Sequence, residues 1–156
     1  MQLILYRGLP GSGKDYVIRK AFAGYNHFCF HIYSADSFRY VDGVYKFDPK
    51  TDTAHQQCFR TLMDDLSDLS DYESDFIFVI NNTNSSAWEI APYMLAAAAH
   101  DIPAEIRTIY CDPLVAFKRG THGVPLDTIL KMQRNILMAD LPPFWKHTII
   151  TNEDDT

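Results

Sequence analysis

The sequence predicts a three-layer α/β domain, in which helices cover both faces of a parallel β-sheet. Strand-like and helix-like patterns alternate along the chain, which is typical of this fold class. A glycine-rich segment joins the first apolar strand to the first helix. The chain has 156 residues, of which 47% are hydrophobic and 22% charged, so we expect one globular domain over 1–156.

The glycine-rich segment follows an apolar strand at 3–6 and precedes a helix at 16–22. It consists of Gly8, Leu9, Pro10, Gly11, Ser12, Gly13, Lys14 and Asp15. Glycines let successive backbone N–H groups point at phosphate oxygens, and the following helix adds the positive end of its dipole. Lys14 is then expected to reach the β- and γ-phosphates of a nucleoside triphosphate. The alternative is a turn with a structural role alone, which only joins the strand to the helix.

Asp15 departs from the usual phosphate-loop pattern. The lysine is normally followed by Ser or Thr, whose hydroxyl binds magnesium. A carboxylate at Asp15 repels a triphosphate unless a cation lies between them. The loop alone therefore predicts nucleotide binding more firmly than efficient catalysis.

A second strand is expected at 28–33, followed by polar residues. Asp36 and Arg39 come just after it, at the carboxyl end of the strand, where ligands gather in parallel sheets. The segment 40–49 carries turn signals and is expected to be a substrate-facing flap or a small hairpin. A helix should follow from 53 to about 69, with its aspartates on a solvated face.

The rest of the chain continues the alternation. We expect strands at 76–80, 102–110 and 148–151, and helices at 86–99, 112–119 and 126–138. The strand at 76–80 is the most continuous apolar run and should be buried on both faces. The helix, glycine-flanked break and helix over 112–138 are typical of a mobile lid.

Composition narrows the possible partners. A net charge of -6 gives no general attraction for nucleic acid, so a polynucleotide would need a local basic patch. Cys29, Cys58 and Cys111 are expected to be buried thiols and not a disulfide framework or a zinc site. No apolar run is long enough to span a membrane, and Met1 leads straight into a strand, so we expect a cytoplasmic protein.

Taken together, these motifs resemble the polynucleotide-kinase-like P-loop family. The likeness rests on 8–14, 34–36, 43–49, 82–84 with Trp88, and 118–119 with 122–125. The likeness covers nearly the whole chain. The chain is similar to phage polynucleotide 5′-kinases and to the AAA-type ATP-binding domains of the NEDD4-binding protein 2 group. The resemblance implies a kinase-type P-loop NTPase fold with a helical lid, and ATP and magnesium (Mg2+) as cofactors.

The resemblance also implies roles for individual residues. Asp36 would be the general base that takes a proton from a 5′-hydroxyl, and Arg39 would steer the phosphate of the acceptor. Arg119 would stabilise the transferring phosphate, with Lys118 or Arg134 assisting. We also assign Asn82 and Asn84 to the substrate side. Without the family, Asp36 could equally cap a helix, and the cationic side chains could simply be solvated.

Two positions differ from the family pattern. Relatives usually carry Ser or Thr at the position of Asp15 and an aspartate at the position of Asn81. We hypothesise that Asp15 supplies the charged magnesium ligand and Asn81 the neutral one, which keeps the charge near the metal while moving it. The competing interpretation is that both usual ligands are lost and the domain binds nucleotide weakly or not at all.

The favoured function is ATP-dependent phosphorylation of a 5′-hydroxyl end of DNA or RNA. The acidic chain favours a single-stranded or short nucleic acid end. The aromatic residues of 38–47 could stack on its bases, although about half of them could equally pack in the core. One alternative is a kinase of a nucleoside, a small molecule or a hydroxymethylated base in DNA. Another is a nucleotide-binding module without catalysis.

Overall fold

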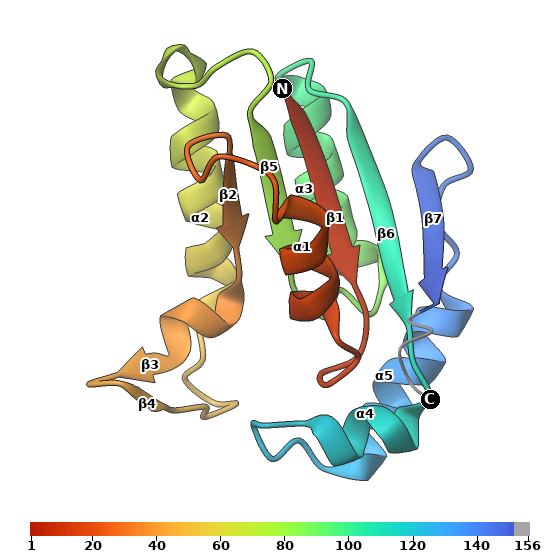
Figure 1. Ribbon diagram of the computed structural model, residues 1–156. Helices are drawn as coiled ribbons and strands as arrows, with labels where there is room; N and C mark the ends of the chain where they lie inside the picture. Colours follow the sequence, from red (N-terminus) through yellow and green to blue (C-terminus); the bar gives the residue numbers. More distant parts are fainter. Residues whose placement is uncertain (152–156) are drawn as a thin grey trace.

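The computed structural model describes residues 1–151, and its centre is a five-stranded parallel sheet in the order β2-β5-β1-β6-β7 (Figure 1). The strands are β1 (Gln2–Arg7), β2 (Phe30–Tyr33), β5 (Ile77–Asn81), β6 (Ala104–Tyr110) and β7 (Lys146–Thr151). Because β1 is the middle strand, the glycine-rich loop leaves the sheet near the centre of its carboxyl edge.

The helices form layers on both sides of this sheet. They are α1 (Lys14–Phe22), α2 (Ala54–Ser67), α3 (Ala87–Ala99), α4 (Pro113–Arg119) and α5 (Leu126–Met138). One face packs against α1 and the other against α2 and α3, while α4 and α5 lie toward the carboxyl ends of the strands (Figure 1). The predicted three-layer arrangement is confirmed.

The alternation of side chains along β1 explains the two layers. Leu3 and Leu5 pack with residues of α2 and α3, whereas Ile4 and Tyr6 pack with Ile18 of α1. Successive side chains of a strand point to opposite faces, so both faces of β1 are buried. Burying each large apolar side chain stabilises the fold by about 1.5–3 kcal/mol.

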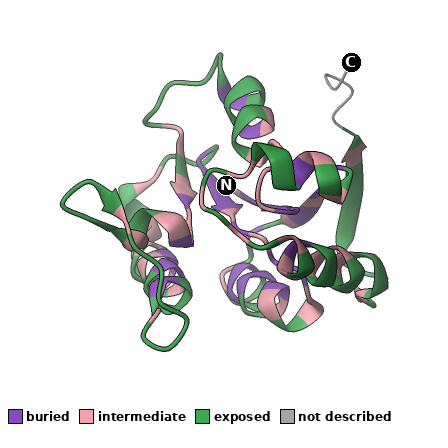
Figure 2. Cartoon of the chain, turned by 90° about the horizontal axis from the view of Figure 1, so that it is seen from below, coloured by how far each residue is buried: buried purple, intermediate pink, exposed green. Residues whose placement is uncertain are grey.

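The segment after β2 forms the small hairpin that the sequence left as one option. A 3-10 helix, η1 (Ala35–Arg39), leads into β3 (Tyr40–Val41), which pairs antiparallel with β4 (Val44–Tyr45). The turn has φ 52° at Asp42 and 76° at Gly43, as a two-residue hairpin turn requires. Seen from the carboxyl ends of the strands, this hairpin is an exposed arm, while the strand ends at the centre are buried (Figure 2).

Three expectations need correction. The second strand begins at Phe30 instead of residue 28, because Asn26 accepts hydrogen bonds from the N–H groups of Phe28 and Cys29 and so forms a turn. Cys29 is consequently half-exposed, although Cys58 and Cys111 are buried as expected. The solvated face of α2 also has an exception, because Asp65 accepts a hydrogen bond of 2.5 Å from the Tyr33 hydroxyl.

The remaining short element is η2 (Leu69–Asp71), which follows α2. Across residues 1–151, no helix is long and apolar enough to cross a membrane.

Candidate functional site

Glycines set the backbone of the loop between β1 and α1. Gly11 has φ 79° and Gly13 has φ 86°, a region that favours glycine. A Cβ on Gly11 would lie 2.1 Å from the carbonyl oxygen of Ala116 and 3.1 Å from the amide nitrogen of Gly120. The loop therefore packs backbone to backbone against α4, and no larger residue fits at Gly11 without movement.

Lys14 begins α1 and folds back over this loop. Its Nζ donates to the carbonyl oxygens of Gly8 and Leu9, each at 2.9 Å. Burial lowers the pKa of Lys14 to about 8, while the negative charges of Asp15 and Asp36 act to raise it. The ammonium thus lies within electrostatic reach of both carboxylates.

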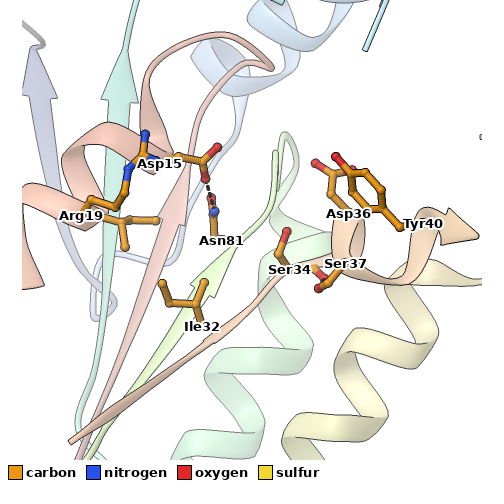
Figure 3. A pocket seen from close by; sticks show the side chains of 9 residues that line it. Asp15, Arg19, Ile32, Ser34, Asp36, Ser37, Tyr40 and Asn81 are labelled. Atoms are coloured by element: carbon orange, nitrogen blue, oxygen red, sulfur yellow. Dashed lines mark hydrogen bonds between the residues drawn. The ribbon is translucent and has the colours of Figure 1, made fainter. Parts of the chain in front are cut away.

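Asp15 and Asn81, which the sequence assigns to magnesium, lie in direct contact. The Nδ2 group of Asn81, at the end of β5, donates to Oδ1 of Asp15, in the first turn of α1, at 2.6 Å (Figure 3). Oδ1 of Asn81 is buried and has no hydrogen-bond partner among residues 1–151. An orphaned oxygen beside a carboxylate fits a hard cation such as magnesium.

These two residues would hold a cation only together with other ligands. No cluster of three or more His, Cys, Asp and Glu side chains suited to a metal occurs within the described chain. Magnesium usually keeps several waters and binds through one or two carboxylates plus substrate phosphates. The donor set therefore fits a metal that arrives with a nucleotide better than a resident metal.

A pocket of about 440 Å³ opens between α1 and the carboxyl ends of β2 and β5 (Figure 3). Its lining residues are Asp15, Ile18, Arg19, Ile32, Ser34, Asp36, Ser37, Tyr40 and Asn81. This volume falls within the range of small-molecule sites. The pocket brings Asp36, from η1, together with the pair formed by Asp15 of α1 and Asn81 of β5.

Asp36 is held by two donors on one oxygen. Its Oδ1 accepts from Nη1 of Arg39 at 2.7 Å and from the Tyr45 hydroxyl at 3.1 Å. Burial raises the pKa of Tyr45, and the nearby Asp36 charge raises it further, so the phenol stays a donor. Asp36 lies inside η1, whose cap position is Ser34, so it does not cap this helix.

Arg39 is fully engaged with carboxylates. Its Nε and Nη2 bind the two oxygens of Asp52 at 3.1 and 2.8 Å, and its guanidinium lies 5.0 Å from the Phe47 ring centre. Burial acts to lower the pKa of Arg39, but the hydrogen bonds to Asp52 and Asp36 outweigh it and raise the pKa. The side chain is only 13% exposed, so in this conformation it positions Asp36 and does not offer itself to a phosphate.

Asn82 and Asn84, which the sequence analysis assigns to the substrate side, follow the carboxyl end of β5, but both amides have partners inside the protein. Asn82 is 5% exposed; its Oδ1 accepts from the Ala35 amide at 2.8 Å and its Nδ2 donates to the Tyr93 hydroxyl at 3.4 Å. Asn84 is 2% exposed, and its Nδ2 donates to the Tyr6 carbonyl at 3.4 Å. Neither lines the pocket, so their contacts favour a positioning role over direct substrate contact.

The helical segment expected to form a lid is packed against the loop. Leu9, Cys111, Ala116 and Ile129 form one apolar cluster that joins the loop to α4 and α5. Arg119 is exposed at the end of α4, next to the Gly11 contact, and does not line the pocket. The break between the helices reaches the hairpin, where His122 stacks on Tyr45 with ring centres 3.9 Å apart and planes at 16°.

Two residues near the pocket, Asp52 and Arg19, had no role in the sequence-based assignment, and Tyr45 was expected only as one of the aromatic residues that could stack on bases. Tyr45 and Asp52 position the Asp36 and Arg39 pair, and Arg19 lines the pocket from α1. Tyr45 belongs to the aromatic residues of 38–47, which were a usable signal. Asp52 is 13 residues from Arg39, and Arg19 is one arginine on an amphipathic helix, so neither stands out in the sequence.

No family model matches the chain. The chain is 29% identical over 146 residues to human NEDD4-binding protein 2; the match covers 83% of this chain and 7% of that protein's length. Among solved structures, Chaetomium thermophilum Kti12 in complex with ADP-AlF3 is similar, with a TM-score of 0.68, 14% identity, and coverage of 98% of this chain and 90% of that one.

Two further structures share the architecture. A gluconokinase from Sinorhizobium meliloti 1021 has a TM-score of 0.59 and 12% identity, covering 96% of this chain and 82% of that one. A chain of the Pnkp1/Rnl/Hen1 RNA repair complex has a TM-score of 0.63 and 18% identity, covering 87% of this chain and 44% of that one. With the strand order and the loop geometry, these similarities confirm the predicted fold class: the chain has a kinase-type P-loop NTPase fold.

Proposed function

We propose that this domain transfers the γ-phosphoryl group of ATP to a hydroxyl group, and that its acceptor is a 5′-hydroxyl end of DNA or RNA. One observation carries the proposal: Asp36 lines the same pocket as Asp15 and Asn81, which adjoin the phosphate loop. A candidate general base and a candidate donor site therefore open onto one cavity.

In the proposed reaction, the loop N–H groups and Lys14 hold the β- and γ-phosphates. The acceptor hydroxyl oxygen bonds to the γ-phosphorus as the bond from that phosphorus to the β,γ-bridging oxygen breaks, and ADP leaves. Asp36 takes the hydroxyl proton, with its carboxylate oriented by Arg39 and Tyr45. Arg119, at the end of α4 beside the loop, is our proposed stabiliser of the charge on the transferring group.

We further propose that Asp15 and Asn81 bind a magnesium ion that accompanies ATP. The ion would neutralise phosphate charge, and the buried Oδ1 of Asn81 supports the assignment. Asp15→Ser alone should then lose magnesium-dependent transfer, whereas Asp15→Ser with Asn81→Asp should restore it. Equal activity in the wild type, both single variants and the double variant would contradict the exchange of ligands.

One observation favours a nucleic acid end as the acceptor, and the net charge bears on the length of that partner. A chain of an RNA repair complex is among the solved structures with a similar fold. The net charge of -6 disfavours long duplexes, because few phosphates could be neutralised at once, and so favours short or single-stranded partners.

A transfer assay tests the proposal. The protein is incubated with γ-labelled ATP and magnesium together with a single-stranded 5′-hydroxyl oligonucleotide, the same oligonucleotide already 5′-phosphorylated, a duplex, DNA containing a hydroxymethylated base, a nucleoside, or no acceptor. The labelled phosphate should be transferred to the 5′-hydroxyl oligonucleotide and not to the same oligonucleotide with a 5′-phosphate. Transfer only to the nucleoside or the modified base would establish the small-molecule or base kinase instead. ATP binding without any transfer would establish a non-catalytic module.

A further inference from the structure

Arg7 is a charged side chain in the interior of the protein. It is the last residue of β1 and only 1% exposed, which places it among the largest fully buried side chains. Arg7 continues the alternation of Leu3 and Leu5, so its side chain points to the face of the sheet that α3 covers. Burial removes the hydration of a charged group, and such groups are rarely buried without a partner of opposite charge. The fold therefore holds a positive charge where water does not stabilise it.

The protein compensates this charge only in part. Nη2 of Arg7 donates to the carbonyl oxygen of Ser85 at 3.0 Å, while the buried Nε has no hydrogen-bond partner among residues 1–151. Glu89 acts on Arg7 through space, but its Oε2 already accepts hydrogen bonds from Ser85 and Ser86. Burial lowers the pKa of Arg7 to about 10, although the charge of Glu89 acts to raise it. Arg7 thus remains charged at neutral pH and is bound mainly by a neutral carbonyl group.

This charge lies next to the start of the phosphate loop. Gly8, the residue after Arg7, donates its amide hydrogen to the Thr83 carbonyl at 3.1 Å and accepts from Nζ of Lys14 at 2.9 Å through its own carbonyl oxygen. The bond from Arg7 to Ser85 runs beside the bond from Gly8 to Thr83. The guanidinium is therefore held between the start of the loop and the segment that follows β5.

We propose that Arg7 is a buried counter-charge for the phosphates of the nucleotide, which it attracts through space without touching them. A triphosphate held by the loop supplies the negative charge that the surroundings of Arg7 lack. The attraction acts through the protein interior, where water and salt screen it less than at the surface, and it offsets part of the repulsion from Asp15 and Asp36. This inference rests on the proposed function only for the nucleotide as the ligand of the loop.

Binding measurements test this inference without requiring phosphoryl transfer. A non-hydrolysable ATP analogue and ADP, each with magnesium, are titrated into the wild type, Arg7→Gln, Arg7→Lys and Arg60→Gln. We expect Arg7→Gln to weaken binding of the analogue about tenfold and binding of ADP less, because ADP carries less negative charge. Arg7→Lys keeps the charge and should keep most of the affinity. Arg60 is an exposed arginine of α2 whose charge is screened by solvent, so Arg60→Gln should change neither affinity.

Glu89→Gln gives a second test, with an expected effect of opposite sign. Glu89 forms the capping box of α3 with Ser86, and glutamine can form the same box, so the helix should persist. Without this carboxylate, more of the positive charge of Arg7 is left for the nucleotide, and the ATP analogue should bind about threefold more tightly. If Arg7→Gln does not fold in urea denaturation experiments, the direction of the change in Glu89→Gln decides.

Several outcomes would overturn the inference. Equal losses for the ATP analogue and ADP in Arg7→Gln would mean that the variant changes the shape of the loop and not its charge. Unchanged affinity in Arg7→Gln, or weaker binding in Glu89→Gln, would overturn it as well. If the variants behave as expected but no acceptor receives phosphate from ATP, the counter-charge stands and the kinase proposal fails. If transfer occurs and Arg7→Gln binds the analogue as the wild type does, the kinase stands and this inference fails.

Discussion

The two parts of the proposed site, a donor end at the phosphate loop and an acceptor end at η1, are built by different means. The donor end is a backbone structure, in which Gly11 and Gly13 adopt left-handed conformations and the loop lies directly against the backbone of α4. The acceptor end is a network of side chains, in which Arg39 and Tyr45 converge on Asp36 and Asp52 anchors Arg39. We therefore expect a change of backbone conformation to impair the donor end, and the removal of single polar groups to impair the acceptor end.

The largest expected effect tests the acceptor end. Asp36→Asn should lower the rate of phosphoryl transfer by about 10²- to 10⁴-fold, because the general base is removed. Arg39 keeps its two bonds to Asp52, so the fold and the affinity for an ATP analogue should persist. Single-turnover transfer and analogue binding measure the two effects, with Asp64→Asn on the exposed face of α2 as the control. Full transfer by Asp36→Asn would refute the base assignment.

The next effect tests the donor end. Gly11→Ala should lower the free energy of unfolding by about 2–4 kcal/mol, since the new Cβ collides with the Ala116 carbonyl and the conformation has positive φ. Affinity for an ATP analogue should fall as well. Gly24→Ala is the matched control, because nothing lies within 4 Å of its Cβ position. Urea denaturation giving the same stability for both variants would show that the loop is not packed as described.

A smaller effect follows from the protonation of Lys14. Its pKa of about 8 is below the ordinary 10.5, so the free protein loses this charge above about pH 8. Affinity for an ATP analogue should then fall up to tenfold per pH unit above about pH 8, whereas folding stability should rise over the same window because the unfolded chain binds more protons. Calorimetric titration with the ATP analogue at pH values from about 7 to about 9.5 measures the affinity. A flat affinity profile would contradict the buried state of the ammonium.

The smallest effect concerns Tyr45. Tyr45→Phe removes one hydrogen bond to Asp36 and keeps the ring that stacks on His122. Transfer should slow about fivefold, the equivalent of a hydrogen bond of about 1 kcal/mol, with unchanged affinity for the ATP analogue. Tyr25→Phe removes a half-exposed phenol away from the pocket and should have no effect. A loss of nucleotide affinity in Tyr45→Phe would mean that the two ends are coupled.

The same contrast explains what could be predicted from the sequence. Glycine spacing, an apolar strand and a helix identify the donor loop, because backbone conformation limits which residues fit at Gly11 and Gly13. The alternation of strands and helices likewise predicted the layers. The predicted start of β2 at residue 28 was wrong, because a turn centred on Asn26 overrides the apolar pattern of 28–29.

The acceptor end was only partly predictable. Asp36 and Asn81 stand at strand ends, where a parallel sheet collects ligand groups, so their convergence could be expected. The engagement of Arg39 by Asp52 and the inward bonds of Asn82 depend on packing between segments distant in the chain. A list of polar residues does not reveal which of them already have partners, so the contacts that hold Arg39 could not be foreseen from the sequence.

The position of β2 in the sheet also bears on local unfolding. β1, which leads into the phosphate loop, is hydrogen-bonded to strands on both sides, whereas β2, which leads to Asp36, pairs within residues 1–151 with β5 alone. An edge strand with one neighbour opens at lower free energy than a central one, so backbone amides near Asp36 should exchange their hydrogens with solvent sooner than those of β1. The hydrogen bond from the Ala35 amide to Asn82 ties the segment after β2 to the residues that follow β5.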